Sequence, residues 1–143
     1  MTWLLDTNVI SEVRKSTGHP HVRAWMARQA PQELYLSAIS VLEIQRGIAQ
    51  TIQRGDVRQA EVITRWLQGR VLPAFAGRIV AMDHLIAQQA GNLPWPDARD
   101  FRDAVIAATA LALRAAVVTR NVRHFEGAGV ELVNPWEFSV KEN

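Results

Sequence analysis

An α/β fold with a central parallel sheet, covered by helices on both faces, is the architecture that this sequence predicts. Short apolar runs of strand length alternate with longer segments in which apolar residues recur every three or four positions, as on one face of a helix. Alternating strands and helices are typical of parallel sheets. One helical segment, residues 104–113, is apolar on nearly all sides, which indicates a helix buried between other layers.

The first half of the chain contains two expected strands and four expected helices. Asp6 separates the first strand from the helix that follows, Pro31 ends the second helix, and Gly55 joins the last two helices into a hairpin. In chain order, the elements are a strand at 3–5, a helix at 7–13, a helix at 21–30, a strand at 34–36, a helix at 38–54 and a helix at 56–72.

The second half continues the alternation. One helix begins at Asp83, directly after a strand, and Asp103 opens the buried helix. The segment 91–101, with Pro94 and Pro96, is the longest irregular stretch. In chain order, the elements are a strand at 78–82, a helix from 83, the buried helix at 103–113, a strand at 116–119 and a last strand at 131–133.

Length and composition fit one domain over residues 1–143, with 48% hydrophobic residues to build a core. Cysteine is absent, which excludes disulfides and thiolate zinc sites and suits a reducing cytoplasm, where we expect the protein to work. The N-terminus lacks a basic leader followed by an apolar stretch, and no window approaches the about 20 apolar residues of a membrane span. We therefore expect neither export nor a membrane anchor.

Arginine dominates the basic residues. Only two of the 16 basic residues are lysines, Lys15 and Lys141, and the formal net charge is +2. Because the guanidinium group matches phosphate oxygens, this bias favours a nucleic-acid partner. A GC-rich genome would produce the same bias, so charge alone leaves both explanations open.

Four polar side chains are expected at one edge of the sheet. Asp6 follows the first strand and Asn121 follows the strand at 116–119. Ligands of open parallel sheets bind outside the carboxyl ends of the strands. Glu43 lies early in its helix and Asp103 at the start of the buried helix, so both can face the same edge. These four residues are the candidate catalytic residues.

Three carboxylates, those of Asp6, Glu43 and Asp103, would repel one another at this edge unless a cation neutralised them. Hard oxygen ligands without cysteine or a histidine cluster favour Mg²⁺ or Mn²⁺ over zinc. A site of this kind supports metal-assisted hydrolysis of a phosphodiester. The sequence therefore predicts Mg²⁺ held by these carboxylates, with Mn²⁺ as a substitute.

Each acidic residue also has a structural explanation. Asp6 and Asp103 can be helix N-caps, whose carboxylates accept the free N–H groups of the first turn. Residues 40–43 fit a capping box, and a surface salt bridge with Arg46 would also account for Glu43. Taken one residue at a time, these structural explanations are the stronger ones.

Three further residues are placed outside the site. Asp83 follows a strand and starts a helix, so we expect it only to cap that helix. His84 and His124 lack a partner at metal-ligand spacing. We expect these two histidines near the site or on the surface, and not as ligands.

Five sequence motifs, in order and in register, resemble those of the PIN-domain toxins over essentially the whole chain. Within that family the sequence looks closest to the FitB-like branch of the VapC proteins. The motifs are 4–12 (LLDTNVISE), 36–43 (LSAISVLE) with Gly47, 103–110 (DAVIAATA), 119–121 (TRN) and 134–136 (NPW).

This resemblance implies a three-layer α/β/α sandwich, usually a homodimer, that is the toxin of a type II toxin–antitoxin system. Such a toxin is a Mg²⁺- or Mn²⁺-dependent endoribonuclease that a cognate VapB- or FitA-like antitoxin holds inactive. The partners that the resemblance implies are therefore RNA, that antitoxin and a second copy of the chain. No membrane is involved.

The site residues of the family carry over to the positions that match its motifs. Asp6, Glu43 and Asp103 fall on the acidic metal-binding positions. The fourth position, often Asp in the family, is Asn121 here, and its neutral amide puts a second metal ion in question. Thr7 and Thr119 match polar residues that border the family site.

Two other functions stay open on the sequence alone. A haloacid-dehalogenase-type phosphatase also starts with an apolar strand followed by an Asp, as in residues 6–9 (DTNV), but the second Asp of its motif is missing. Its phosphate-binding lysine is missing too, because Lys15 and Lys141 lie in other regions. A non-catalytic PIN-like binding domain would keep the fold and lose the reaction, and the three retained acids argue against it.

Overall fold

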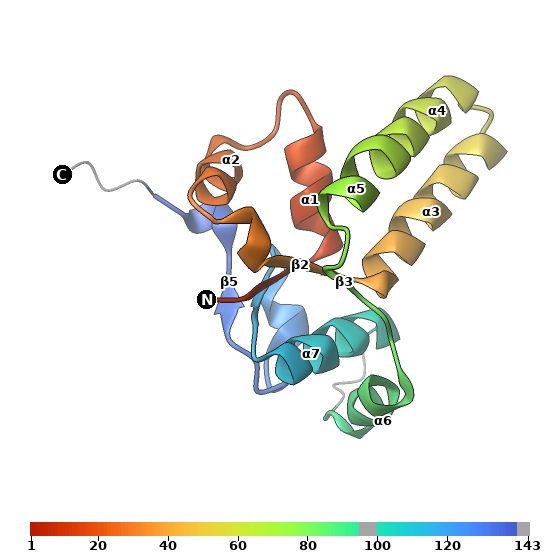
Figure 1. Ribbon diagram of the computed structural model, residues 1–143. Helices are drawn as coiled ribbons and strands as arrows, with labels where there is room; N and C mark the ends of the chain where they lie inside the picture. Colours follow the sequence, from red (N-terminus) through yellow and green to blue (C-terminus); the bar gives the residue numbers. More distant parts are fainter. Residues whose placement is uncertain (95–99, 140–143) are drawn as a thin grey trace.

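A five-stranded, all-parallel sheet forms the centre of the protein (Figure 1). The computed structural model describes residues 1–94 and 100–139 of the chain. The strands stand in the order β3-β2-β1-β4-β5, and all neighbours run parallel. They are β1 (Trp3–Leu5), β2 (Leu34–Ser37), β3 (Ile79–Val80), β4 (Ala116–Val118) and β5 (Leu132–Val133).

Helices connect the strands on both sides of this sheet. Within the described residues they are α1 (Thr7–Arg14), α2 (Pro20–Ala27), α3 (Ala38–Gln53), α4 (Val57–Trp66), α5 (Leu72–Ala74), α6 (His84–Asn92) and α7 (Phe101–Leu113). A π-helical segment, Leu67–Val71, links α4 to α5, so the single helix expected over 56–72 has three parts. Gly55 turns the chain between α3 and α4 with φ of +84°, a conformation that favours glycine.

The helices form two layers with the sheet between them (Figure 1). α6 and α7 pack on one face, and α1 to α5 lie on the other. Alternation of side chains along the strands separates the two cores. Leu4 and Val117 join the core on the α7 side, whereas Leu5 and Val118 join the core on the α1 side. The predicted α/β fold, a parallel sheet between two helical layers, is confirmed.

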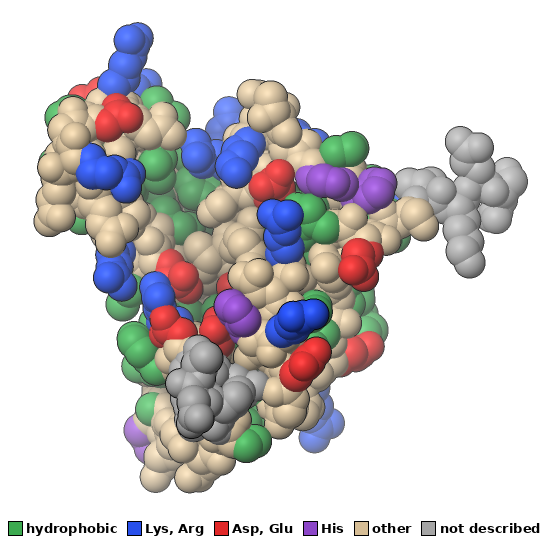
Figure 2. All heavy atoms as spheres, turned by 180° about the vertical axis from the view of Figure 1, so that it is seen from behind, with side chains coloured by type: hydrophobic (Ala, Val, Ile, Leu, Met, Phe, Trp, Pro, Cys, Tyr) green, Lys and Arg blue, Asp and Glu red, His purple; other side chains and the backbone are tan. Residues whose placement is uncertain are grey.

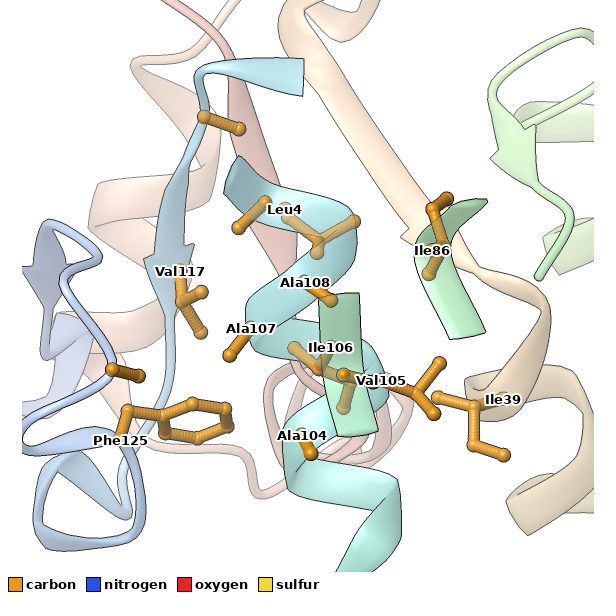
Figure 3. Packing of buried hydrophobic residues seen from close by; sticks show 14 residues of the cluster. Leu4, Ile39, Ile86, Ala104, Val105, Ile106, Ala107, Ala108, Val117 and Phe125 are labelled. Atoms are coloured by element: carbon orange, nitrogen blue, oxygen red, sulfur yellow. The ribbon is translucent and has the colours of Figure 1, made fainter. Parts of the chain in front are cut away.

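α7 is the buried helix that its composition predicts (Figure 3). Ala104 and Ala107 are fully buried, and their small side chains let the helix approach the sheet closely. Ile106 belongs to the same core cluster as Leu4 of β1. This packing fixes the first turn of α7, which carries Asp103, relative to the carboxyl ends of the strands.

The start of one helix and the cap of another differ from the sequence predictions. Asp100 is the N-cap of α7, so Asp103 lies inside the first turn and does not cap the helix. Ser37 is the N-cap of α3 and accepts the N–H of Ile39 at 3.1 Å, so the capping box expected at 40–43 is wrong. In α7 the continuous apolar run begins only after Arg102 and Asp103, which explains why the pattern placed the start of the helix too late.

The ends of the other elements also shift. β3 spans two residues where 78–82 was expected, and α2 ends at Ala27 rather than at residue 30. α6 continues through Asn92 into the expected irregular segment, of which 95–99 lie outside the described residues. Strand ends depend on the ladder with the neighbouring strand, which apolar residues alone do not reveal. No helix in the described part of the chain is long and apolar enough to cross a membrane.

Candidate active site

Asp6 stands at the carboxyl end of β1, beside the end of β4. Because Leu5 pairs with Val118 in the sheet, Asp6 and Thr119 follow the two strands side by side. The Thr119 hydroxyl donates a hydrogen bond to Asp6 Oδ2 at 2.8 Å. Asp6 Oδ1 accepts the Thr7 backbone N–H at 2.8 Å, which makes Asp6 the N-cap of α1. With 7% of its surface exposed, Asp6 is held in one orientation by these bonds.

Glu43 lies at the same edge of the sheet, where it contacts a residue of α1. It lies in the second turn of α3, a helix that starts directly after β2. Thr7 Oγ1 lies 2.9 Å from Ser40 Oγ and 3.2 Å from Glu43 Oε1. Asn8 adds a longer contact, since its Nδ2 donates to Asp6 Oδ2 at 3.3 Å. Side chains of α1 therefore connect two acidic residues that are far apart in the sequence.

Asp103 reaches this edge from the first turn of α7, and we call Asp6, Glu43 and Asp103 the acidic cluster. Asp103 Oδ2 lies 3.4 Å from His124 Nδ1. The neighbouring Arg102 places Nη1 3.8 Å from Glu43 Oε2. Its Nη2 lies 2.5 Å from Oδ2 of Asp100, the N-cap of α7. On the face shown in Figure 2, acidic side chains gather near the middle, next to basic side chains and a histidine.

Burial makes the negative charges of the acidic cluster costly. Burial raises the pKa of Asp6 above its ordinary value, and hydrogen bonds from Thr119 and Thr7 offset part of that rise. Burial, followed by the charge of Asp6, also raises the pKa of Glu43 and of Asp103. The three carboxylates are thus close enough to repel one another, and a divalent cation would remove that repulsion.

The donor set of the cluster fits a hard cation, because it consists of carboxylate and hydroxyl oxygens. Over residues 1–94 and 100–139, no group of three or more Asp, Glu or His side chains is already arranged to hold a metal ion. Glu43 contacts Thr7 and Arg102, and Asp103 lies beside His124. Arg102 beside Glu43 and His124 beside Asp103 are the neighbours with which a metal ion would compete for these carboxylates.

Asn121, the fourth predicted residue, is placed differently. Its backbone N–H donates to Thr119 Oγ1 at 3.0 Å, which ties it to the partner of Asp6. Asn121 is exposed and lines a pocket of about 300 Å³ with Arg120 and His124. Among the described residues, no hydrogen bond joins its side chain to the acidic cluster. The structure therefore brings three of the four predicted residues together and leaves Asn121 at the border.

Other residues of this region differ in how well the sequence predicted them. Asp83 caps α6 by accepting the Ile86 N–H at 2.9 Å, as predicted. The salt bridge expected between Glu43 and Arg46 is wrong, because Arg102 of the facing helix is the partner that Glu43 has. Sequence reasoning missed Arg102, and it gave Asn8 no part in this site. Their only sequence signal is proximity to Asp103 and Asp6, respectively.

Known proteins are similar to this chain in sequence over nearly its full length. Residues 3–130 match the family model described as PIN domain. The chain is 39% identical over 139 residues to VapC ribonuclease Y4jK of Sinorhizobium fredii, a match that covers 94% of this chain and 97% of that protein. It is 35% identical over 138 residues to toxin FitB of Neisseria gonorrhoeae, covering 93% and 97%.

Solved structures agree with these relatives. The crystal structure of FitAcB from Neisseria gonorrhoeae matches with a TM-score of 0.85 and 32% identity, covering 96% of this chain and 100% of that chain. A structure of FitAB bound to an IR36 DNA fragment matches with a TM-score of 0.84 and 31% identity, covering 99% and 100%. The chain therefore belongs to the PIN-domain family, in the group that includes the VapC and FitB toxins.

Proposed function

We propose that this chain is the toxin of a type II toxin–antitoxin system and acts as a Mg²⁺- or Mn²⁺-dependent endoribonuclease. The observation that carries the proposal is the acidic cluster: Asp6 at the end of β1, Glu43 in α3 and Asp103 in the first turn of α7 meet at the carboxyl edge of a parallel sheet. Burial, followed by the charge of Asp6, raises the pKa of Glu43 and Asp103 there. The names of two relatives, a VapC ribonuclease and toxin FitB, support the same activity.

In this proposal Asp6, Glu43 and Asp103 hold the ion. When bound, the ion supplies Lewis acidity for phosphodiester hydrolysis and neutralises the cluster. The Thr119 hydroxyl and the Thr7 backbone N–H orient Asp6, because each donates to a different carboxylate oxygen. The Thr7 hydroxyl positions Glu43 against α1.

The rival functions receive less support from the site. In a haloacid-dehalogenase-type phosphatase a second Asp would stand where this chain has Asn8, whose amide donates to Asp6. Lys15 follows the end of α1 and lies 3.5 Å from Glu12, so it is paired away from the acidic cluster. A non-catalytic PIN-like binding domain would bind RNA without cutting it, and a cleavage assay separates it from a nuclease.

Cleavage of total RNA tests the proposal. We expect the purified protein to cut RNA in buffer with Mg²⁺ or Mn²⁺ and to stop when EDTA is added, because the carboxylates alone provide no Lewis acid. Asp6→Asn is the matched inactive control. RNA that stays intact with and without metal would favour the non-catalytic binding domain.

We further propose a cognate VapB- or FitA-like antitoxin as the partner of a homodimeric, cytoplasmic toxin. The similarity to FitB in the FitAcB and FitAB complexes supports this partner. We expect a small protein encoded next to this chain to co-purify with it and to prevent growth arrest on co-expression. If the neighbouring gene product neither binds nor rescues growth, the toxin–antitoxin assignment fails even where RNA cleavage stands.

Asn121 is expected to tune metal binding rather than the reaction. Its neutral amide occupies the position where the family often carries Asp, and its side chain lies outside the contacts of the acidic cluster. Asn121→Asp should lower the Mg²⁺ concentration for half-maximal cleavage, and Asn121→Ala should raise it by about 10- to 100-fold, as for a residue that orients a metal ligand. An Asn121→Ala protein as inactive as Asp6→Asn would instead make this amide an essential ligand.

A further inference from the structure

A groove leads from the acidic cluster between α1 and the α3–α4 hairpin. It has a volume of about 290 Å³ and is lined at one end by Thr7 and Glu43, and at the other by Arg14, Arg54 and Trp66. Figure 2 shows the molecule hollowed between the hairpin and the remaining helices, with basic side chains on the rim. The groove therefore joins the candidate site to a basic surface.

Two arginines give the far end of the groove its charge. Arg14 is the last residue of α1, and its guanidinium lies 5.7 Å from the ring centre of Trp66, a cation–π contact that supports it. Arg54 caps the end of α3, and its Nη2 donates to Thr51 Oγ1 at 3.2 Å. Among the described residues neither arginine forms a salt bridge, so both charges are available to an anion.

The basic surface continues past Trp66. Arg65 and Arg70 line a second pocket, of about 240 Å³, together with the same tryptophan. The charge thus changes from acidic at the cluster to basic along the groove. A polyanion fits this pattern when its reacting bond meets a cation at the acidic end and its other phosphates meet arginines.

We propose that this groove binds the backbone of single-stranded RNA beside the bond that the acidic cluster cuts, with Arg14 and Arg54 as phosphate ligands and Trp66 positioning Arg14. The inference rests on the ribonuclease function proposed above and deepens it. A guanidinium can bind phosphate through two parallel hydrogen bonds, which suits a fixed backbone path. The groove has about the volume of a small-molecule site, which suits a single strand better than a duplex.

Binding measured without cleavage tests the inference. A fluorescent single-stranded RNA is titrated with Asp6→Asn protein in EDTA, where no RNA is cut. Adding Arg14→Gln and Arg54→Gln to that protein should weaken binding by about ten-fold, equally for RNAs of different sequence. The slope of log K against log salt should fall by about 1.4, because each phosphate contact on a single strand contributes about 0.7.

The matched control removes two other arginine charges. Arg28 and Arg114 are exposed, lie at the ends of α2 and α7 and do not line the groove. Their double Gln variant should keep the affinity within about two-fold and the salt slope unchanged. Equal losses in the groove variant and this control would overturn the inference, because the arginines would then act only through net charge.

Kinetics separate the groove from the reaction itself. In active protein, Arg14→Gln with Arg54→Gln should raise KM for RNA by about ten-fold and leave kcat within about two-fold, because binding is lost equally in ground and transition states. Trp66→Leu should reproduce part of this effect through Arg14. If Trp66→Leu does not fold, the arginine variants alone decide. Groove-dependent RNA binding without cleavage by the wild-type protein would reject the proposed function and retain only the role of the groove in binding RNA.

Discussion

Replacing Asp6, Glu43 or Asp103 by its amide should reduce RNA cleavage by about 1,000-fold or more. Each amide keeps the size of the side chain and removes a charge that the proposed cation would need. A catalytic metal ion contributes several kcal/mol to transition-state stabilisation, which corresponds to a loss of this order. In the proposed site the three carboxylates share one ion, so Asp6→Asn combined with Asp103→Asn should be about as inactive as either single variant.

Asp83→Asn is the matched control for these variants. Asp83 also caps a helix that follows a strand, but it lies outside the acidic cluster, and Asn is an equally good N-cap. The Asp83→Asn protein should therefore cut RNA and arrest growth like wild type. Full toxicity of the Asp6, Glu43 and Asp103 variants would mean that these acids are structural caps and ion-pair partners only.

Mg²⁺ should raise the melting temperature of the wild-type protein by about 5–10 °C at 100 times its Kd. A ligand bound only by the native state then adds about 2.7 kcal/mol of stability, and each kcal/mol shifts the melting temperature by about 2–4 °C in a domain of this size. EDTA should reverse the shift. Asp103→Asn should show almost none of it, and an equal shift in that variant would place the ion elsewhere.

The stability of the metal-free protein should depend on pH because of the charges in the acidic cluster. The pKa values of Asp6, Glu43 and Asp103 are all raised in the folded protein, chiefly by burial. The folded state therefore binds protons more tightly than the unfolded chain, so stability should fall as pH rises from about 4 through the folded pKa values. Asp6→Asn should weaken this decline, and saturating Mg²⁺ should remove it. Identical curves of stability against pH for wild type and Asp6→Asn would contradict the raised pKa values of the acidic cluster.

The order of strands and helices could be predicted because buried positions are apolar and recur with the period of a strand or a helix. Leu4 and Leu5 are both apolar because they face two different cores, and α7 has almost no polar face because it lies under the sheet. The ends of the elements could not be predicted in this way, because the spacing of apolar residues does not mark them. The start of α7 depends on Asp100, a polar residue before the apolar run, which apolar periodicity cannot distinguish from a loop.

Asp6 could be placed at the site edge because the end of a parallel strand fixes where the next residue lies. The contact between Arg102 and Glu43 could not be predicted, since it depends on how α3 lies against α7. The same is true of Asn121, whose backbone is held by Thr119 while its side chain faces another pocket. Contacts between helices that are distant in sequence need the folded geometry.

The position of a bound ion tests the shared metal site most directly. Crystals of the protein grown with Mn²⁺ would locate the ion by its anomalous scattering. We expect one peak held by carboxylate oxygens of Asp6, Glu43 and Asp103, with Arg102 withdrawn from Glu43 and the peak absent in Asp103→Asn. A protein that cuts RNA yet shows no Mn²⁺ at these carboxylates, or binds it only elsewhere, would contradict the proposed site.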